Sequence, residues 1–300
     1  MDQASDNPSP LHTIVVVAKC PIPGKSKTRL IPKLKEEGSA KLAKAMLSDV
    51  LITLSECAQL AKVRKILFYA PANDQGKTIM NNLLQELDLS TSSTTTTSSD
   101  HPQPRDWMLL PMISQDLTSP NLGDILTDIL QRTRALQNNG NVVFLGMDSP
   151  ELPMEEIVAA INNNQQHAVL CPANDGGYGM LSVPRNAPAD RIFQGIRWSD
   201  PLTALGQIKA LTDANIPVQL GRLMNDIDEE EDLEALCQRL LATAGKDDRI
   251  TNANEHDNQQ QNGNDDVLLQ SSSGSQGPSI TGSCPNTRQI LQELNLLSTP

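Results

Sequence analysis

Short apolar runs alternate with amphipathic segments along most of this chain, and this alternation restricts its fold more than any other feature. The apolar runs predict strands, several of them buried on both faces of a sheet. They cover residues 13–18, 66–70, 107–113, 142–146, 167–171, 178–183 and 218–223. Apolar residues at helical spacing predict helices between them, over 39–60, 76–87, 122–136, 154–162, 201–215 and 230–244. This order predicts an α/β fold with a mostly parallel central sheet and helices on both faces.

Two polar segments interrupt the pattern. Residues 90–106 contain a Ser/Thr run, and residues 246–283 are rich in Asn, Gln, Ser and Asp. Neither segment carries enough apolar surface to offset the entropy of ordering it. We therefore expect one domain over 12–245 with a low-complexity insertion at 90–106, flanked by a disordered N-terminus (1–11) and a disordered tail (246–283). A short C-terminal helix within 284–300 is a candidate to pack on this domain.

Charge and cysteine usage exclude several classes of protein. The chain has 24 Lys and Arg against 36 Asp and Glu, a net charge of −12, which argues against a nucleic-acid partner. No apolar run approaches the length that spans a bilayer, and the N-terminus is polar and acidic, so we expect no membrane partner. Five cysteines, scattered singly, are typical of a reducing compartment. We expect a cytoplasmic protein, and nothing in the sequence indicates its oligomeric state.

The first predicted strand leads into the most basic stretch of the chain. Residues 19–35 contain six Lys and Arg and no acid, beginning with A-K-C-P-I-P-G-K-S-K-T-R-L at 18–30. Ligands of parallel α/β sheets bind beyond the carboxyl ends of the strands, so these cations suit a polyphosphate. A solvated basic surface loop is the alternative. The nucleotide-binding candidates are Lys19, Gly24, Lys25, Lys27 and Arg29.

Acidic residues follow two later strands. Asp148 comes directly after 142–146, where its carboxylate could hold Mg²⁺ or Mn²⁺, or instead form an Asx-turn or cap the next helix. Asp226 and Asp228 alternate about Ile227, so an extended segment would present both carboxylates on one face. The alternative is a set of helix N-terminal acids, which explains residues 229–232 in any case.

Two further segments are less specific. In P-A-N-D-G-G-Y-G-M-L (172–181), paired glycines after Asp175 allow a close backbone approach, although an Asp-Gly hairpin turn explains the segment better on its own. In F-Q-G-I-R-W-S-D-P (193–201), Trp198 lies on a predicted loop, and ordinary packing explains it equally well.

Taken in order, these segments resemble the GT-A-like glycosyltransferase family called radical-SAM/selenodomain-associated transferase 1. That family is related to the 2-phospho-L-lactate guanylyltransferases and, more distantly, to the molybdenum-cofactor guanylyltransferases. The resemblance covers about residues 12–244 and implies a nucleotide-diphospho-sugar transferase (GT-A) fold. It implies that Asp148 binds a metal and acts in catalysis with Lys27 and Arg29. It also implies that Asp228 is a second metal ligand, with Asp226 a nearby candidate.

The same resemblance implies a donor or acceptor pocket. Its candidate residues are Asp175, Gly176, Gly177, Tyr178 and Trp198. Two positions depart from the family's pattern: Gly179 stands where a second aromatic residue is usual, and Glu229 replaces a Thr after the metal aspartate.

We therefore expect a transferase that uses Mg²⁺ or Mn²⁺ and binds a nucleotide or nucleotide-sugar donor and a small-molecule acceptor. Glycosyl transfer is the first expectation, and guanylyltransferase-like nucleotidyl transfer with release of pyrophosphate is the alternative. A non-catalytic nucleotide-binding module is a third hypothesis. Nucleophilic hydrolysis has no support, because no G-x-S-x-G motif or Cys with a plausible His partner is present.

Overall fold

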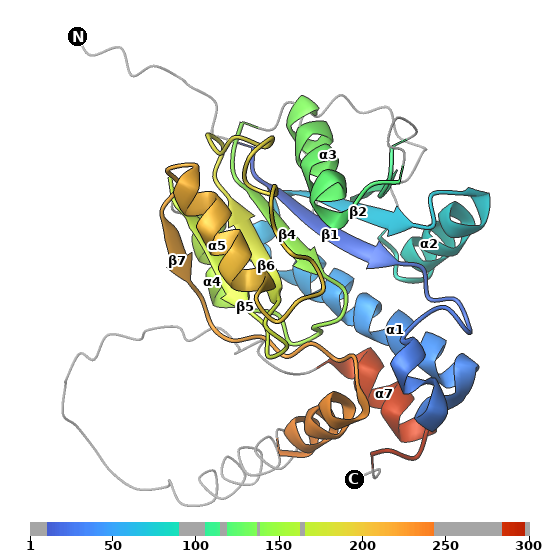
Figure 1. The fold of residues 1–300 in the computed structure, drawn as a ribbon. Helices are drawn as coiled ribbons and strands as arrows, with labels where there is room; N and C mark the ends of the chain where they lie inside the picture. The colour runs from blue at the N-terminus through green and yellow to red at the C-terminus, as the bar shows by residue number, and fades with distance from the viewer. Residues whose placement is uncertain are drawn as a thin grey trace, which may run out of the picture.

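The computed structural model describes residues 11–89, 106–114, 119–136, 139–162, 166–242 and 284–297. Within these ranges lies a seven-stranded sheet in the order β3-β2-β1-β4-β6-β5-β7 (Figure 1). The strands are β1 (Thr13–Lys19), β2 (Arg64–Ala70), β3 (Trp107–Pro111), β4 (Val142–Gly146), β5 (Ala168–Pro172), β6 (Tyr178–Val183) and β7 (Val218–Leu220). Only β6 runs antiparallel to its neighbours β4 and β5, which confirms the predicted mostly parallel sheet.

Helices cover both faces of this sheet, also as predicted (Figure 1). The labelled helices are α1 (Ile31–Glu56), α2 (Asp74–Glu86), α3 (Leu122–Ala135), α4 (Met154–Asn162), α5 (Thr203–Asp213) and α7 (Pro285–Glu293), and residues 230–242 are also helical. Helices α1, α2 and α4 pack on one face, and α3 and α5 pack on the other.

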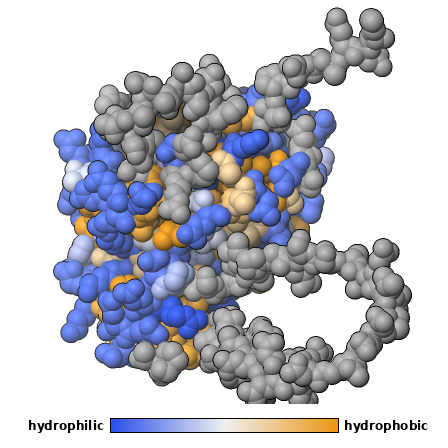
Figure 2. Space-filling model, turned by 180° about the vertical axis from the view of Figure 1, so that it is seen from behind, coloured by the Kyte–Doolittle hydropathy of each residue, from blue (hydrophilic) through white to orange (hydrophobic). Residues whose placement is uncertain are grey.

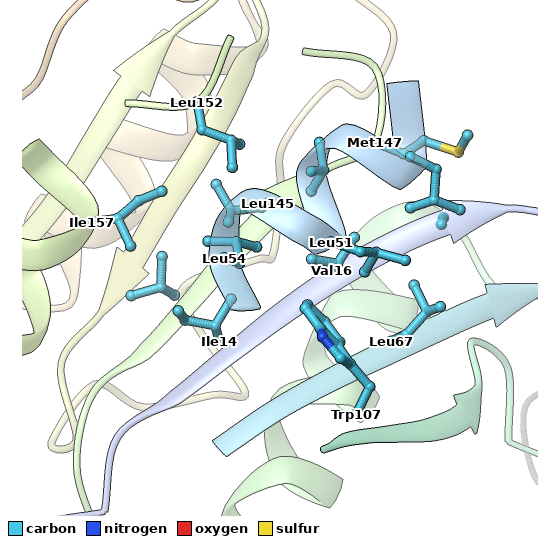
Figure 3. Close-up of a cluster of buried hydrophobic side chains, with 14 of the residues drawn as sticks. Ile14, Val16, Leu51, Leu54, Leu67, Trp107, Leu145, Met147, Leu152 and Ile157 are labelled. Carbon is cyan, nitrogen blue, oxygen red and sulfur yellow. The ribbon is translucent and has the colours of Figure 1, made fainter. Parts of the chain in front are cut away.

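Strand β1 shows why the central strands are apolar throughout. Ile14 and Val16 face α1, where they lie near Leu51 and Leu54, whereas Val15 belongs to the cluster on the opposite face (Figure 3). Every second residue of the strand thus enters a different apolar layer. Both layers are buried, so a polar residue on either face of β1 would lose its contact with water.

A third apolar cluster lies outside these two layers and joins three distant parts of the chain. It combines the start of α1 with helix 230–242 and the C-terminal segment around α7; its members include Leu30, Met46, Ile227, Leu236 and Leu291. Asp49 of α1, which is buried, fastens α7 to this cluster. Its carboxylate accepts the backbone N–H groups of Asn286 (2.9 Å) and Thr287 (2.8 Å), at the first turn of the helix.

The structure differs from the sequence-based prediction at the ends of several elements. Helix α1 begins at Ile31 rather than at residue 39, because Pro32 is compatible with a first helical turn; the helix is broken at Lys35, where φ is 62°. It ends at Glu56, and the short 3-10 helix η2 (Ala58–Leu60) completes the segment expected to be helical. Strands β3 and β7 are shorter than predicted.

The segments expected to be disordered lie, apart from Leu11 and Asp106, outside the described residues, and the predicted domain limits stay a prediction. No helix in the described ranges is both long enough and apolar enough to cross a membrane. Hydrophilic residues predominate among the described side chains on the face shown in Figure 2.

Candidate active site

A cavity of about 540 Å³ lies at the carboxyl edge of the sheet. Its lining comes from the segments that follow β4, β5 and β7, together with the start of α3 and residues 198–203. One part of the lining is acidic, with Asp148, Asp226 and Asp228, and another part is apolar, with Leu122 and Trp198. The cavity therefore offers both charged groups and a hydrophobic wall to a ligand.

The three carboxylates come together although Asp148 is distant in sequence from the other two. One oxygen of each lies within 4.8 Å of those of the other two. The backbone N–H of Ile227 donates to the carbonyl oxygen of Asp148 at 3.1 Å, and the Ile227 side chain is fully buried in the third cluster. The alternation about Ile227 therefore turns Asp226 and Asp228 toward Asp148, as the extended-segment interpretation predicts.

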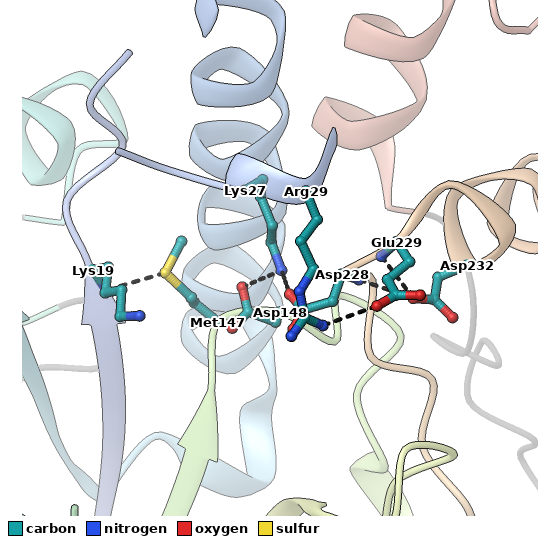
Figure 4. Close-up of polar contacts among 8 residues, drawn as sticks. All are labelled: Lys19, Lys27, Arg29, Met147, Asp148, Asp228, Glu229 and Asp232. Carbon is teal, nitrogen blue, oxygen red and sulfur yellow. Dashed lines mark hydrogen bonds and ion pairs between the residues drawn. The ribbon is translucent and has the colours of Figure 1, made fainter. Parts of the chain in front are cut away.

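Lys27 lies between two of these carboxylates. Its ammonium is 2.6 Å from Asp148 Oδ1 and 2.8 Å from Asp228 Oδ1, and its side chain is only 5% exposed (Figure 4). Burial alone would lower the pKa of Lys27, but the attraction of Asp148 and Asp228 outweighs burial and raises that pKa. Lys27 is therefore a charged ammonium in a confined acidic site.

The two neighbouring aspartates of the loop respond differently to this environment. Burial and repulsion from Asp148 raise the pKa of Asp226 to about 7. The pKa of Asp228 is lowered even though burial opposes the change, because Lys27 lies beside it. Asp226 thus carries most of the repulsion that the cluster leaves uncompensated.

Of the other basic residues of segment 19–35, Arg29 is the one that lines the cavity. Its guanidinium donates to Glu229 at 3.0 Å (Figure 4). The Lys19 backbone N–H donates to the sulfur of Met147, whereas Gly24 adopts φ 74° and packs beside Glu36. Neither Lys19, Gly24 nor Lys25 lines the cavity.

The acidic residues at 229–232 lie at the N-terminus of a helix, as the second interpretation of this segment predicts. Asp232, in the first turn of the helix, accepts the backbone N–H groups of Asp228 (3.1 Å) and Glu229 (2.8 Å), which is the backward contact of a capping box (Figure 4). The acidic segment 226–232 therefore has two roles. Asp226 and Asp228 line the cavity, and the acids that follow them begin the helix at 230.

Three of the four residues of the Asp-Gly-Gly-Tyr segment line the cavity. Asp175, Gly177 and Tyr178 line the cavity, whereas Gly176 does not. Asp175 accepts the Gly177 N–H at 2.8 Å in an Asx-turn. The Tyr178 hydroxyl donates to Gln207 at 3.0 Å, and burial raises the pKa of Tyr178.

Contacts with a neighbouring loop explain why position 176 is a glycine. Its φ is 87°, and a Cβ atom built there would lie 1.9 Å from the carbonyl oxygen of Pro201. The Ala204 backbone N–H also donates to the Gly176 carbonyl oxygen at 2.9 Å. Gly176 therefore lets two loops touch at the cavity rim, rather than letting a ligand approach.

The side chain of Met224 occupies the space next to Gly179 that a larger side chain would need. A Cβ atom at Gly179 would lie 2.7 Å from the sulfur of Met224, which is buried. Met224 thus fills the space where a side chain at position 179 would lie. Trp198 lines the same cavity, and its role in binding a donor or acceptor stays a prediction.

Sequence reasoning did not identify several residues of the lining. Asp200, Leu126 and Phe144 contribute to it, and Leu122 is an apolar residue left exposed at the start of α3. Asp200 follows Trp198 in the segment 193–201, whose aromatic residues are its only distinctive sequence feature. No sequence pattern separates Leu122, which lines the cavity, from the apolar residues of α3 that pack in the core.

Comparisons with known proteins agree with this architecture. Residues 53–200 match the sequence family described as "Uncharacterized protein conserved in bacteria (DUF2064)". No curated protein sequence matches the chain. A crystal structure described as a "putative nucleotide-diphospho-sugar transferase" from Desulfovibrio desulfuricans G20 is similar, with 23% identity and a TM-score of 0.60 over 75% of this chain and 85% of that one.

A weaker likeness is to a cytidylyltransferase from Leptospira borgpetersenii serovar Hardjo-bovis, with 11% identity and a TM-score of 0.45 over 77% of this chain and 87% of that one. The likeness to the Desulfovibrio protein concerns the fold. The chain has an α/β fold with a mixed, mostly parallel seven-stranded sheet in its described part, and this fold resembles that of a nucleotide-diphospho-sugar transferase.

Proposed function

We propose that this protein is a metal-dependent transferase that acts on a nucleotide-activated donor, most simply a nucleotide sugar, and transfers the glycosyl group to a small acceptor. One observation carries the proposal. Three carboxylates from two separate strand ends converge with Lys27 and Arg29 at a cavity on the carboxyl edge of the sheet. Ligands of open α/β sheets bind at this edge.

The donor set suits the metal that such chemistry needs. Asp148, Asp226 and Asp228 would supply only carboxylate oxygens, the ligands preferred by Mg²⁺ and Mn²⁺. A divalent ion held there would neutralise negative charge on the phosphates of the donor.

Side chains of the protein would bind the donor phosphates and stabilise the charge that develops on them. Arg29 lines the cavity, and its pairing with Glu229 orients a guanidinium that can donate to phosphate oxygens. The acceptor hydroxyl oxygen would form a bond to the anomeric carbon while the bond from that carbon to the phosphate oxygen breaks. The electron pair of the broken bond leaves with the nucleoside diphosphate, and the hydroxyl proton passes to water. Cations beside the departing phosphate stabilise the charge that builds there.

The distribution of basic residues favours glycosyl over nucleotidyl transfer. Of the six cations of segment 19–35, only Arg29 lines the cavity. A triphosphate carries more charge than the diphosphate of a nucleotide sugar, so a lining with a single cation suits the latter better. Nucleotidyl transfer remains the second candidate.

A thermal-shift screen with Mn²⁺ tests the proposal. Nucleotide sugars and nucleoside triphosphates are compared with and without the ion, since a ligand at 100 times its Kd stabilises by about 2.7 kcal/mol. We expect a Mn²⁺-dependent shift with a nucleotide sugar, followed by release of the nucleoside diphosphate in the presence of an acceptor. Release of pyrophosphate from a triphosphate would instead select nucleotidyl transfer, and binding without release of either product would select a binding module.

Variants of two aspartates complete the test. Asp148→Ala should lower turnover at least about a hundredfold, in line with the loss of one group that stabilises transition-state charge. Asp213→Ala is the control, because Asp213 only pairs with Lys209 on the surface of α5. A Mn²⁺-dependent shift that survives in Asp148→Ala contradicts the assignment of the metal site.

A further inference from the structure

Lys27 contacts the same carboxylates that the proposed function assigns to a metal. Its ammonium is 2.6 Å from Asp148 and 2.8 Å from Asp228, two of the three members of the acidic cluster. Carboxylate oxygens bind Mg²⁺ at about 2.0–2.1 Å and Ca²⁺ at about 2.3–2.6 Å. An ammonium and a divalent ion against the same Oδ1 atoms would repel each other strongly, so the binding of one weakens the binding of the other.

The cluster requires a positive charge when no metal is bound. Three carboxylates with oxygens within 4.8 Å of one another repel, and the repulsion grows as water is excluded. The side chain of Lys27 is 5% exposed, so its charge is poorly screened and acts strongly on the two acids beside it. Arg29 lines the cavity, but its guanidinium hydrogen-bonds Glu229 at 3.0 Å, outside the cluster of three aspartates.

The backbone at Lys27 shows that this placement is held against a local preference. Its φ is 47° and its ψ is 50°, in the left-handed region, at the residue that precedes the short helix η1 (Thr28–Leu30). This conformation is disfavoured for a residue with a Cβ atom. The two ion pairs offset that cost only while the carboxylates are free to accept from the ammonium.

We propose that Lys27 is the resident counter-ion of the metal-free centre and that a divalent ion displaces it. The inference rests on the proposed metal-dependent function. Once displaced, the ammonium remains on a flexible four-carbon stem at the edge of the cavity, where it can reach a phosphate of the donor. Metal binding thereby creates a free cation for the donor, and metal and donor bind with positive coupling.

Mn²⁺ binding to the full chain tests this exchange without any substrate. Free Mn²⁺ is counted by electron paramagnetic resonance during titration of the wild type, Lys27→Met and Lys33→Met. Lys33 is the matched control, because its ammonium also pairs with two carboxylates, Glu230 (2.6 Å) and Glu234 (2.7 Å), which are exposed and outside the cluster. We expect Lys27→Met to bind Mn²⁺ at least about tenfold more tightly, because no ion pair has to be broken first, and Lys33→Met to bind like the wild type.

A second measurement uses the wild type alone and does not depend on the folding of a variant. Lysine acetylation by a mild reagent is followed by mass spectrometry with and without Mg²⁺. We expect labelling of Lys27 to rise with Mg²⁺, since the released ammonium is more accessible and loses its carboxylate partners, while labelling of Lys33 stays constant.

The outcomes separate this inference from the function on which it rests. Equal or weaker Mn²⁺ binding by Lys27→Met, or Lys27 labelling that Mg²⁺ leaves unchanged, overturns the exchange while the metal site stands. If neither the wild type nor Lys27→Met binds Mn²⁺, although both are folded by circular dichroism, the metal-dependent function itself is overturned and the inference falls with it.

Discussion

Replacing Gly176 by alanine tests whether the contact between two loops shapes the cavity. The substitution adds a Cβ atom where φ is 87° and where the carbonyl oxygen of Pro201 lies only 1.9 Å away. Gly195 offers a matched control, because its φ is 71° and a Cβ atom there meets nothing within 4 Å. The two variants share the same backbone penalty and differ only in the steric clash.

The magnitude follows from adding these two effects. A left-handed φ costs an alanine about 1–2 kcal/mol, so Gly195→Ala should lose about that much free energy of unfolding. Gly176→Ala adds the displacement of a backbone atom that cannot rotate away, and overpacking of this kind costs about 1–3 kcal/mol more. We therefore expect Gly176→Ala to lose about 2–5 kcal/mol.

Urea unfolding followed by circular dichroism measures both values under identical conditions. Because Trp198 and Asp200 lie on the loop that Pro201 belongs to, Gly176→Ala should also weaken donor or acceptor binding, whereas Gly195→Ala should not. Equal losses of stability in the two variants would refute the reasoning, since they would mean that the loops do not touch as described.

Three further predictions concern other parts of the molecule. Asp49→Ala leaves the first N–H groups of α7 without an acceptor and should lower the free energy of unfolding by about 2–5 kcal/mol in urea; a loss below 1 kcal/mol contradicts the cap. Burial lowers the pKa of Lys65 from 10.5 to about 8, so the unfolded chain binds more protons between these values and stability should rise with pH across them. Lys65→Met should remove that rise in a pH series of urea melts. Gly179→Tyr should lower the Tm by clashing with Met224, and adding Met224→Ala should recover part of the loss; additive effects would contradict the contact.

The elements of the fold could be predicted from the sequence because each one is encoded locally. The β-branched run that forms β1 and the helical spacing within α3 need no information from elsewhere in the chain. The same holds for part of the site, since the alternation of Asp226 and Asp228 about Ile227 is a local pattern. Such patterns fix which way side chains face once an element forms.

Contacts between residues far apart in the sequence could not be predicted, because no local pattern encodes them. Lys27 and Asp228 are 201 residues apart, and no local pattern indicates that they form an ion pair. The prediction that Lys27 binds a nucleotide phosphate therefore carries no sign of its carboxylate partners. Asp49 resembles a misplaced acid in an apolar helix until α7 supplies its donors, and Gly176 resembles a turn glycine until Pro201 lies against it.

The cap that Asp49 places on α7 has a consequence for the biosynthesis of the protein. Asp49 precedes its partner Asn286 by 237 residues. At a translation rate of about 5–20 residues per second, the carboxylate waits about 12–47 seconds for α7 to be made. Ile227, which lies between the two aspartates, belongs to the third cluster. Until the α7 segment is made, this cluster lacks Leu291 and its neighbours. The surroundings of the acidic centre are thus completed only after the α7 segment has been made, more than 200 residues after Lys27.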